Sequence, residues 1–209
     1  MNINIIILGN EGVGKTTILD SFIEKKFFPA EHPTLGIDTR VVNVKTDNNQ
    51  LIQYNYFDSE GSEKDNSTNL SFISKADGII LVYDGELSEE KKKTDLLKWK
   101  NIIGKYCTPD IYKYVWLVCN IKSKNTIVNI VKEKEIIKTL NYSTNLLSVI
   151  DYEDHTHKIN PFFETVNNTI LEKDEILKGF MLKLMNLYNY LLPKLPHKSA
   201  HLPIQKRHI

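Results

Sequence analysis

The feature that most constrains this chain is a glycine-rich turn, GNEGVGKT, which spans Gly9 to Thr16. An apolar run at 3–8 precedes it directly and predicts a buried strand, and residues from about 15 to 25 predict a helix. The turn fits the pattern G-x-x-x-x-G-K-[S/T], and a strand before it with a helix after it is the context which that pattern requires. A loop of this kind surrounds phosphate oxygens with backbone N–H groups at a helix N-terminus. The sequence therefore predicts a phosphate-binding loop in an α/β fold.

The residues of this loop have separate expected roles. The Lys15 ammonium would neutralise charge on the β- and γ-phosphates of a nucleotide, and the Thr16 hydroxyl would ligate Mg²⁺. The rest of the loop completes the expected nucleotide-binding set, namely Glu11, Gly12, Val13, Gly14 and Thr17. The alternative is a chance match on a surface turn, and the flanking strand and helix argue against it.

The remainder of the chain alternates short apolar runs with helical segments. The expected strands after the first are 38–46, 50–57, 79–84, 115–120 and 145–150. Helices are expected in the segment that ends in LLKWKNII, at 129–140, and from Pro161, while 59 to about 69 is expected to be polar and flexible. This alternation predicts a mixed, mostly parallel six-stranded sheet with helices on both faces, and the hairpin at 38–57 adds an antiparallel edge.

Composition excludes several classes of protein. A chain of 209 residues with a formal net charge of +1 favours one α/β domain and gives no general attraction to nucleic acid or membrane. Two cysteines are too few for a disulfide framework and fit a reducing, cytoplasmic compartment. We find no signal peptide, membrane-spanning run or lipidation motif, so neither a transmembrane segment nor a lipid anchor is expected.

Three further segments extend the pattern set by the loop. PTLGID places Thr34 19 residues after Lys15, FDSEGSE at 57–63 corresponds to W-D-x-A-G-Q-E, and the segment 71–84 ends in GIILVYD. With the loop, these segments resemble the Ras superfamily of small GTPases, and its Rab branch most closely, over roughly residues 3–170. The resemblance implies the Ras-like P-loop GTPase fold, with Mg²⁺ and GTP or GDP as ligands.

The resemblance also implies roles for individual residues. Thr34 corresponds to the switch I threonine, which contacts Mg²⁺ and the γ-phosphate. Asp58 would hold Mg²⁺ through water, which gives a metal set of Thr16, Thr34 and Asp58, and the Gly61 N–H would face the γ-phosphate. Phe57 and Phe72 correspond to two aromatic residues of an effector-binding patch, although both side chains could instead belong to the core.

Three departures from the family concern hydrolysis. Ser62 stands where the family has a glutamine that orients the attacking water, and serine is too short to reach that water. Glu11 occupies a loop position that is usually small, so its carboxylate either crowds the γ-phosphate or turns into solvent. Arg40 is the one arginine near these loops, which argues against an internal arginine finger. We therefore expect slow hydrolysis.

A fourth departure concerns recognition of the base. The family motif N-K-x-D corresponds here to Asn120, Ile121, Lys122 and Ser123. Ile121 could still cover a base face, but Ser123 cannot replace the carboxylate that binds guanine, a loss worth about 2–4 kcal/mol. Ser148 in Ser-Val-Ile is the nearest candidate for the last family loop, S-A-K. Weakened guanine recognition is therefore expected.

The C-terminal part adds features that the family does not explain. Helical spacing of apolar residues predicts an apolar helix at 175–192, in an extension over 174–193 that follows a domain at 1–173. This helix either packs on the domain, docks on a partner or lies on a membrane, and the tail at 194–209 is expected to be loosely ordered. The two histidines of YEDHTHK form either a metal site or, more commonly, a solvated loop.

Taken together, the sequence favours a Rab-like small GTP-binding protein that acts as a switch or scaffold in intracellular vesicle or protein transport. The resemblance extends to Rab-like subunits of ciliary transport complexes, which would place the chain on such a complex through its partners. Two alternatives stay open. One is an active GTPase in which Glu63 or a partner positions the water, and the other is a pseudo-GTPase that serves as an interaction module.

Overall fold

A computed structural model describes residues 1–24, 32–45, 49–62, 67–123, 126–142, 147–150 and 158–172, with the backbone alone at 67–70 and 113. Residues Met1–Ile170 form one compact unit. The strands are β1 (Asn2–Leu8), β2 (Ile37–Lys45), β3 (Leu51–Ser59), β4 (Gly78–Asp84), β5 (Val115–Asn120) and β6 (Leu147–Ile150). The helices are α1 (Lys15–Glu24), α2 (Ser67–Ser74), α3 (Glu89–Tyr106), the 3₁₀ helix η1 (Pro109–Tyr114), α4 (Ile130–Thr139) and a further helix at 158–172.

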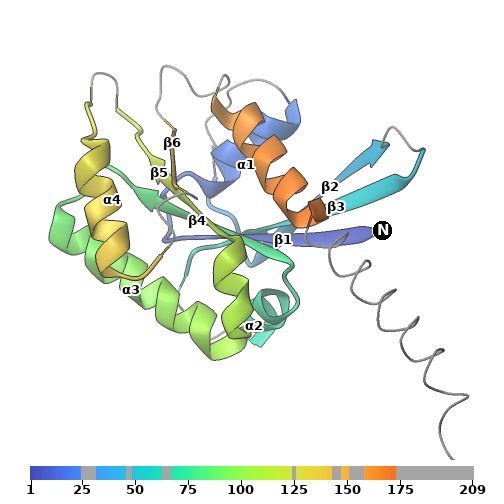
Figure 1. Cartoon of the computed structure of the whole chain (residues 1–209), viewed down its shortest axis with the longest axis horizontal. Coiled ribbons are helices and arrows are strands. Elements are labelled where there is room, and N and C mark those ends of the chain that lie inside the picture. Colours follow the sequence, from blue (N-terminus) through green and yellow to red (C-terminus); the bar gives the residue numbers. More distant parts are fainter. Residues whose placement is uncertain are drawn as a thin grey trace, which may run out of the picture. The chain divides into compact units, whose positions relative to one another are not determined.

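The six strands form a single sheet in the order β2-β3-β1-β4-β5-β6 (Figure 1). All neighbouring strands pair in parallel except β2 and β3, which pair antiparallel from Ile37 opposite Ser59 to Lys45 opposite Leu51. Every residue of β5 is buried, as expected for an inner strand of a sheet covered on both faces. The predicted mixed, mostly parallel sheet is confirmed.

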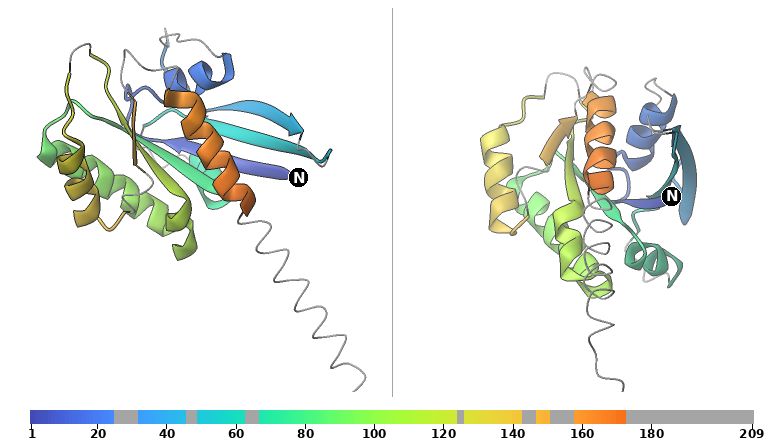
Figure 2. Two further views of the ribbon diagram at one scale, coloured as in Figure 1. Left: turned by 45° about the horizontal axis from the view of Figure 1, so that its top comes forward. Right: turned by 45° about the vertical axis from the view of Figure 1, so that its right-hand side comes forward.

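Helices cover both faces of the sheet (Figures 1 and 2). On one face lie α1 and the helix at 158–172, where Phe22 stacks on Phe163 with ring centroids 4.1 Å apart. On the other face α2, α3 and α4 bury Ile73, Trp99 and Ile136 in a core shared with β1, β4 and β5. This core fixes the strand ends that carry the polar residues of the candidate site.

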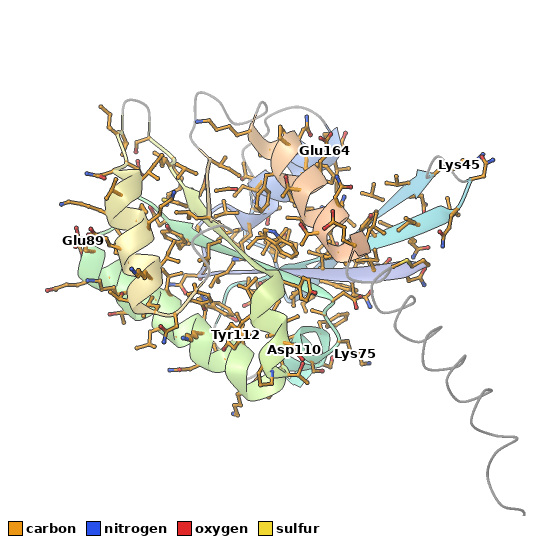
Figure 3. The ribbon with its side chains drawn as sticks, in the orientation of Figure 1. Lys45, Lys75, Glu89, Asp110, Tyr112 and Glu164 are labelled. Carbon is orange, nitrogen blue, oxygen red and sulfur yellow. The ribbon has the colours of Figure 1, made fainter. Side chains whose placement is uncertain are left out.

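Local signals explain where the helices begin. Ser88 caps α3 by accepting from the Lys91 N–H, and the Asn129 side chain accepts from two backbone N–H groups at the start of α4. On η1, Tyr112 faces α3 and donates a hydrogen bond of 2.9 Å to the carbonyl of Lys100 (Figure 3). Glu164, on the helix at 158–172, is exposed to solvent (Figure 3).

Two expectations about local structure need correction. The segment expected to be polar and flexible from 59 to about 69 includes the last residue of β3 and the start of α2. Burial of Ile73 in the core stabilises this short helix, and the polar sequence before it does not indicate a helix. The final helix is already present at 158, where the described part of the chain resumes, so it includes the three residues before Pro161.

Some expectations fall on other parts of the chain. Five of them lie outside the described residues and stay predictions. These are the boundary at 173, the apolar segment 175–192, the tail 194–209, the two histidines in the segment 152–157, and Glu63. Among the described helices, none combines the length and apolar character needed to cross a membrane.

Candidate nucleotide-binding site

The glycine-rich loop lies between β1 and α1, as the sequence predicts. Lys15 is the first residue of α1, and its Nζ donates to the carbonyls of Gly9 and Asn10 at 3.0 and 2.9 Å. Gly14 has a φ of +96°, and a Cβ there would overlap the Asn120 side chain, so the loop needs glycine at this position. The loop borders a pocket lined by Glu11, Gly12, Gly14, Lys15, Thr16, Thr17, His32, Pro33, Thr34, Ser59 and Glu60.

Three oxygen-bearing side chains converge beside Lys15. The Thr16 hydroxyl donates to Asp58 Oδ2 at 2.5 Å and lies 2.9 Å from the Thr34 hydroxyl, which itself lies 3.4 Å from Asp58 Oδ2. Asp58 is buried, and its Oδ1 has no hydrogen-bond partner in the described part of the chain. A carboxylate and two hydroxyls are hard oxygen donors, and the unpartnered Oδ1 leaves Asp58 able to accept from a metal-bound water. The three residues fit the Mg²⁺ site that the sequence predicts.

The charge on Lys15 is the main electrostatic feature of this pocket. Burial lowers the pKa of Lys15 to about 8, against the opposing effects of the carboxylates of Asp58, Glu11 and Glu60. Burial also raises the pKa of Asp58, although hydrogen bonds from Thr16 and the Lys15 charge oppose this effect. Both charged groups are therefore held partly desolvated, where an added phosphate or metal ion interacts strongly with them.

The residues expected to act in hydrolysis follow β3. Gly61 is buried at a φ of +85°, and a Cβ there would overlap Lys15 Nζ and the backbone of Asn10. The chain after β3 therefore lies directly against the phosphate loop. The neighbouring Ser62 Oγ is buried and, among the described residues, has no hydrogen-bond partner.

Two charged residues near the loop are placed differently. Glu11 is exposed, at the edge of the pocket, yet near enough to Lys15 to affect its pKa. Arg40 lies on β2, where its guanidinium pairs with Asp38 and with Asp20 Oδ1, the latter at 3.4 Å. Arg40 thus forms ion pairs beside the sheet.

Asn120 joins the expected base side of the site to the phosphate loop. It ends β5, is buried, and donates from Nδ2 to the Val13 carbonyl at 2.8 Å. Asn120 Oδ1 is buried, with no hydrogen-bond partner among the described residues. Asn120 and Val13, both named in the expected nucleotide-binding set, are therefore in contact.

Of the two residues after Asn120, Lys122 rather than Ile121 reaches the phosphate loop. Ile121 is only 3% exposed and lies against Gly85, so its side chain belongs to the protein interior. Lys122 is the residue that reaches the loop, with Nζ 3.5 Å from the Gly12 carbonyl and 2.6 Å from Asp84 Oδ2. The expected apolar cover from Ile121 is not supported by this geometry.

Ser123 and Ser148 do not join the other site residues. The Ser123 N–H donates to Glu86 Oε1 at 3.0 Å, and a bond from the Ser123 hydroxyl is the largest cause of the lowered pKa of Glu86. Ser148 lies within β6 opposite Val118, and only Ile150 is level with Asn120. Ser148 therefore lies two residues before the level of Asn120 in the sheet.

Phe57 and Phe72 contact each other, with ring centroids 4.7 Å apart. Both side chains are half-buried against the core beneath α2 and α3, so each has one covered and one accessible side. They are therefore available both to the core and to a partner.

The structure also adds residues that the sequence did not indicate. Trp99 of α3 donates from Nε1 to Asn10 Oδ1 at 2.8 Å, which ties the helix to the phosphate loop. Glu60 contacts the chain just after Thr34, and Lys122 contacts Gly12. The spacing of the motifs carries no signal for these contacts, because each depends on how side chains from distant segments pack.

The sheet order and the convergence of loop, Thr34 and Asp58 define a protein with the Ras-like GTPase fold. Comparison with known proteins agrees. The family described as Ras of Complex, or Roc, domain of DAPkinase matches residues 4–124. The chain belongs to the Ras superfamily, as a divergent Rab-like small GTPase.

Several relatives are Ras-related proteins at moderate identity. The chain is 34% identical to mouse Ras-related protein Rab-12 over 108 residues, which is 52% of this chain and 43% of the relative. It is 29% identical to Rab-18 of Caenorhabditis elegans over 126 residues, or 60% of this chain and 61% of the relative. Against SEC4 of Saccharomyces cerevisiae it is 30% identical over 106 residues, covering 51% and 48%. The matches thus span about half the length of these relatives.

Proposed function

We propose that this chain is a Mg²⁺-dependent nucleotide-binding switch or scaffold in intracellular vesicle or protein transport, with secure phosphate binding, weakened guanine recognition and slow hydrolysis. The observation that carries the proposal is the contrast within one site. Thr16, Thr34 and Asp58 converge beside Lys15, whereas Ser62 and Ser123 replace the groups that orient water and bind guanine.

Phosphate binding rests on Lys15 and the loop backbone. The buried Lys15 ammonium lies among loop carbonyls, where it can turn to a phosphate oxygen without crossing solvent. Thr16, Thr34 and Asp58 would hold Mg²⁺, which supplies charge neutralisation on the phosphates when bound. Asp58 keeps these two hydroxyls together, so the donors are already assembled for the ion.

Slow hydrolysis follows from Ser62. A serine hydroxyl reaches less far than a glutamine amide, and the Ser62 Oγ is buried rather than directed into open solvent. Without a group that orients water, the reaction loses several orders of magnitude in rate. Glu11 at the edge of the pocket would add repulsion to charge that develops on the γ-phosphate.

Weak guanine recognition follows because the groups on the base side of the site contact other parts of the protein. Ser123 is hydrogen-bonded to Glu86, and Ile121 is buried. Neither supplies the charged acceptor that distinguishes guanine from adenine, so discrimination between purines should be small.

Titration with GDP, GTP and ADP in Mg²⁺, followed by single-turnover hydrolysis, tests the proposal. We expect binding at micromolar Kd or tighter, a GDP-to-ADP preference of less than about 100-fold, and turnover well below the intrinsic rate of ordinary small GTPases, about 10⁻⁴ s⁻¹. Turnover comparable to or above that rate would favour the active enzyme instead. Absence of binding to all three nucleotides would favour the pseudo-GTPase interaction module.

The partner surface is proposed at β2, β3 and α2, where Phe57 and Phe72 are half-buried. Proteins of this superfamily act through effectors that recognise the two switch segments. We propose that this surface, together with the segment 175–192, attaches the chain to a transport complex, on a membrane or in a cilium. Phe72→Ala and Phe57→Ala should weaken capture of a purified effector without loss of nucleotide binding. Loss of nucleotide binding in both variants would show that these residues serve the core alone.

A further inference from the structure

Glu60 connects two segments that border the phosphate pocket. Its backbone N–H donates to the Gly36 carbonyl at 2.9 Å, and its carboxylate Oε2 accepts from the Gly36 N–H at 2.9 Å. We call this pair of hydrogen bonds the Glu60–Gly36 bridge. The residue corresponding to Glu60 in the family pattern W-D-x-A-G-Q-E is alanine, which has no group that could accept the Gly36 N–H.

The bridge lies at the end of the pairing between β2 and β3, beside the two switch segments. The antiparallel pairing of β2 and β3 ends at Ile37 opposite Ser59, and the bridge adds the next pair beyond that end. Thr34 lies two residues before Gly36, and Gly61 directly follows Glu60. These are the two residues that a γ-phosphate is expected to contact, one from each switch segment.

In Ras-type switches, contacts to the γ-phosphate and Mg²⁺ order the two switch segments, and hydrolysis releases them. The Glu60–Gly36 bridge joins the same two segments by bonds within the chain, which do not depend on a phosphate. A charge-assisted hydrogen bond from a backbone N–H to a carboxylate is stronger than one between neutral groups. In Ras-type switches the arrangement of the two segments depends on the γ-phosphate. Here the Glu60 side chain stabilises that arrangement.

The carboxylate also adds negative charge to the pocket. Glu60 lines the pocket together with Lys15, Thr16 and Thr34, and its charge acts on Lys15. Gly61, which is expected to face a γ-phosphate, directly follows Glu60, whereas the β-phosphate is expected to be bound by the loop N–H groups. Glu60 therefore disfavours the third phosphate more than the second.

We infer that Glu60 is a specificity-determining residue for the nucleotide state: it joins the switch segments in the diphosphate form and lowers the preference for triphosphate. This inference rests on the proposed nucleotide binding and adds how the site is regulated. Of the two proposed roles, the inference favours the scaffold: the protein would present nearly the same surface at the switch segments with either nucleotide, and its partners would not distinguish the two states.

Three variants separate the two effects of Glu60. Glu60→Ala removes both the acceptor for the Gly36 N–H and the charge. Glu60→Gln keeps an acceptor oxygen and removes only the charge. Glu11→Gln removes a carboxylate from the same pocket, and no hydrogen bond joins Glu11 to Gly36 among the contacts described above.

Hydrogen exchange of the Gly36 amide and nucleotide titration provide the two readouts. In the wild type, Gly36 exchange with GDP and with a non-hydrolysable GTP analogue should agree within about twofold. Glu60→Ala should speed Gly36 exchange at least about tenfold with GDP, with recovery in the analogue, whereas Glu60→Gln and Glu11→Gln should stay near wild type. The ratio of analogue to GDP affinity should rise about tenfold in Glu60→Gln and in Glu60→Ala.

Two results would overturn the inference. One is a wild-type Gly36 amide that is protected only with the triphosphate analogue, and the other is Gly36 exchange that Glu60→Ala leaves unchanged. If no nucleotide binds, the proposed function fails, yet comparison of Gly36 exchange between the ligand-free wild type, Glu60→Ala and Glu60→Gln still decides whether the bridge exists. Equal unfolding midpoints of the three proteins ensure that the exchange differences are local.

Discussion

The phosphate side and the base side of the candidate site differ in what their polar groups contact. On the phosphate side, Thr16, Thr34 and Asp58 contact one another, and Asp58 Oδ1 has no hydrogen-bond partner in the described part of the chain. On the base side, Ser123 contacts Glu86, and Lys122 contacts Asp84 and the loop. One set of groups is assembled for a ligand, and the other is used mainly within the protein.

Under the proposed function, this difference explains how a nucleotide site can keep phosphate binding while its guanine recognition weakens. Phosphate and metal binding depend on a backbone loop and on three side chains that also hold switch I against β3. Base recognition depends on a short loop after β5, which the core does not need for packing beyond Ile121. A substitution at Ser123 therefore costs little stability, whereas one at Asp58 would remove the carboxylate that holds the partly buried hydroxyls of Thr16 and Thr34.

Removal of the Lys15 charge would disrupt phosphate binding and has the largest expected effect on nucleotide affinity. Lys15→Met should weaken both GDP and ADP binding by about 1,000-fold or more, about 4 kcal/mol, because a buried charged partner of the phosphates is lost. Isothermal titration measures this directly. Lys91→Met is the matched control, since Lys91 is exposed on α3 and pairs only with Asp95 among its described ion pairs. A Lys15→Met protein that still binds at wild-type affinity would show that nucleotide binds elsewhere.

Restoring a carboxylate on the base side would sharpen the comparison. Ser123→Asp combined with Glu86→Gln should tighten GDP binding about 10- to 100-fold, or about 1.5–3 kcal/mol, and leave ADP binding nearly unchanged. Glu86 is changed as well because its carboxylate contacts the Ser123 N–H and would repel a new aspartate. Ser123→Asn in the same Glu86→Gln background is the neutral control. Equal gains for GDP and ADP would mean that position 123 does not face the base.

The sheet could be predicted from the sequence, and so could the place of the phosphate loop between β1 and α1, because both depend on local patterns. The apolar runs of β4 and β5 and the loop pattern ending in Lys15 each depend on neighbouring residues, and pairing of parallel strands then follows. Asp58 and Thr34 could be placed through the spacing of recognised segments. Helix α2 could not be predicted, because it depends on burial of Ile73 by α3 and β4.

The base side was predicted less well, because position in a motif does not determine side-chain direction. Ile121 occupies the motif position of the family lysine, yet burial draws an isoleucine toward Gly85 and leaves Lys122 to reach Gly12. Ser148 matches the family loop in residue type, but its strand pairing with Val118 places it within the sheet. The sequence gives no signal for Glu60, because no motif assigns a role to a side chain at a position where the family has alanine.

A change of pH tests the phosphate side without a mutation. The pKa of free Lys15 is about 8 because of burial, and phosphate binds the protonated form. The folded protein therefore loses the binding form as pH rises through 8, so affinity should be level below about pH 7.5 and about tenfold weaker at pH 9. ADP is the ligand to use, since its base does not titrate in this range. The slope should vanish in Lys15→Met, and an equal slope in that variant would assign the titration to another group.

Substitutions of Lys122 and Ile121 test where the phosphate side of the site ends and the base side begins. They have the smallest expected effects on nucleotide binding. Lys122→Met should weaken GDP and ADP equally, by about three- to tenfold or roughly 1 kcal/mol, because its ammonium supports the loop carbonyl of Gly12 through a long hydrogen bond and no contact specific to guanine is involved.

Ile121→Ala should act on a different quantity. It should lower the free energy of unfolding by about 2–4 kcal/mol through loss of buried side-chain volume, with the ratio of GDP to ADP affinity unchanged. Urea unfolding and paired titrations measure the two effects on the same preparations. If Ile121→Ala instead reduced affinity at constant stability, Ile121 would be the cover of the base after all, and the base side would retain a recognition surface of its own. If Lys122→Met weakened GDP binding more than ADP binding, Lys122 itself would contribute to base recognition. The boundary between the two sides of the site would then lie after Lys122 rather than after Asn120.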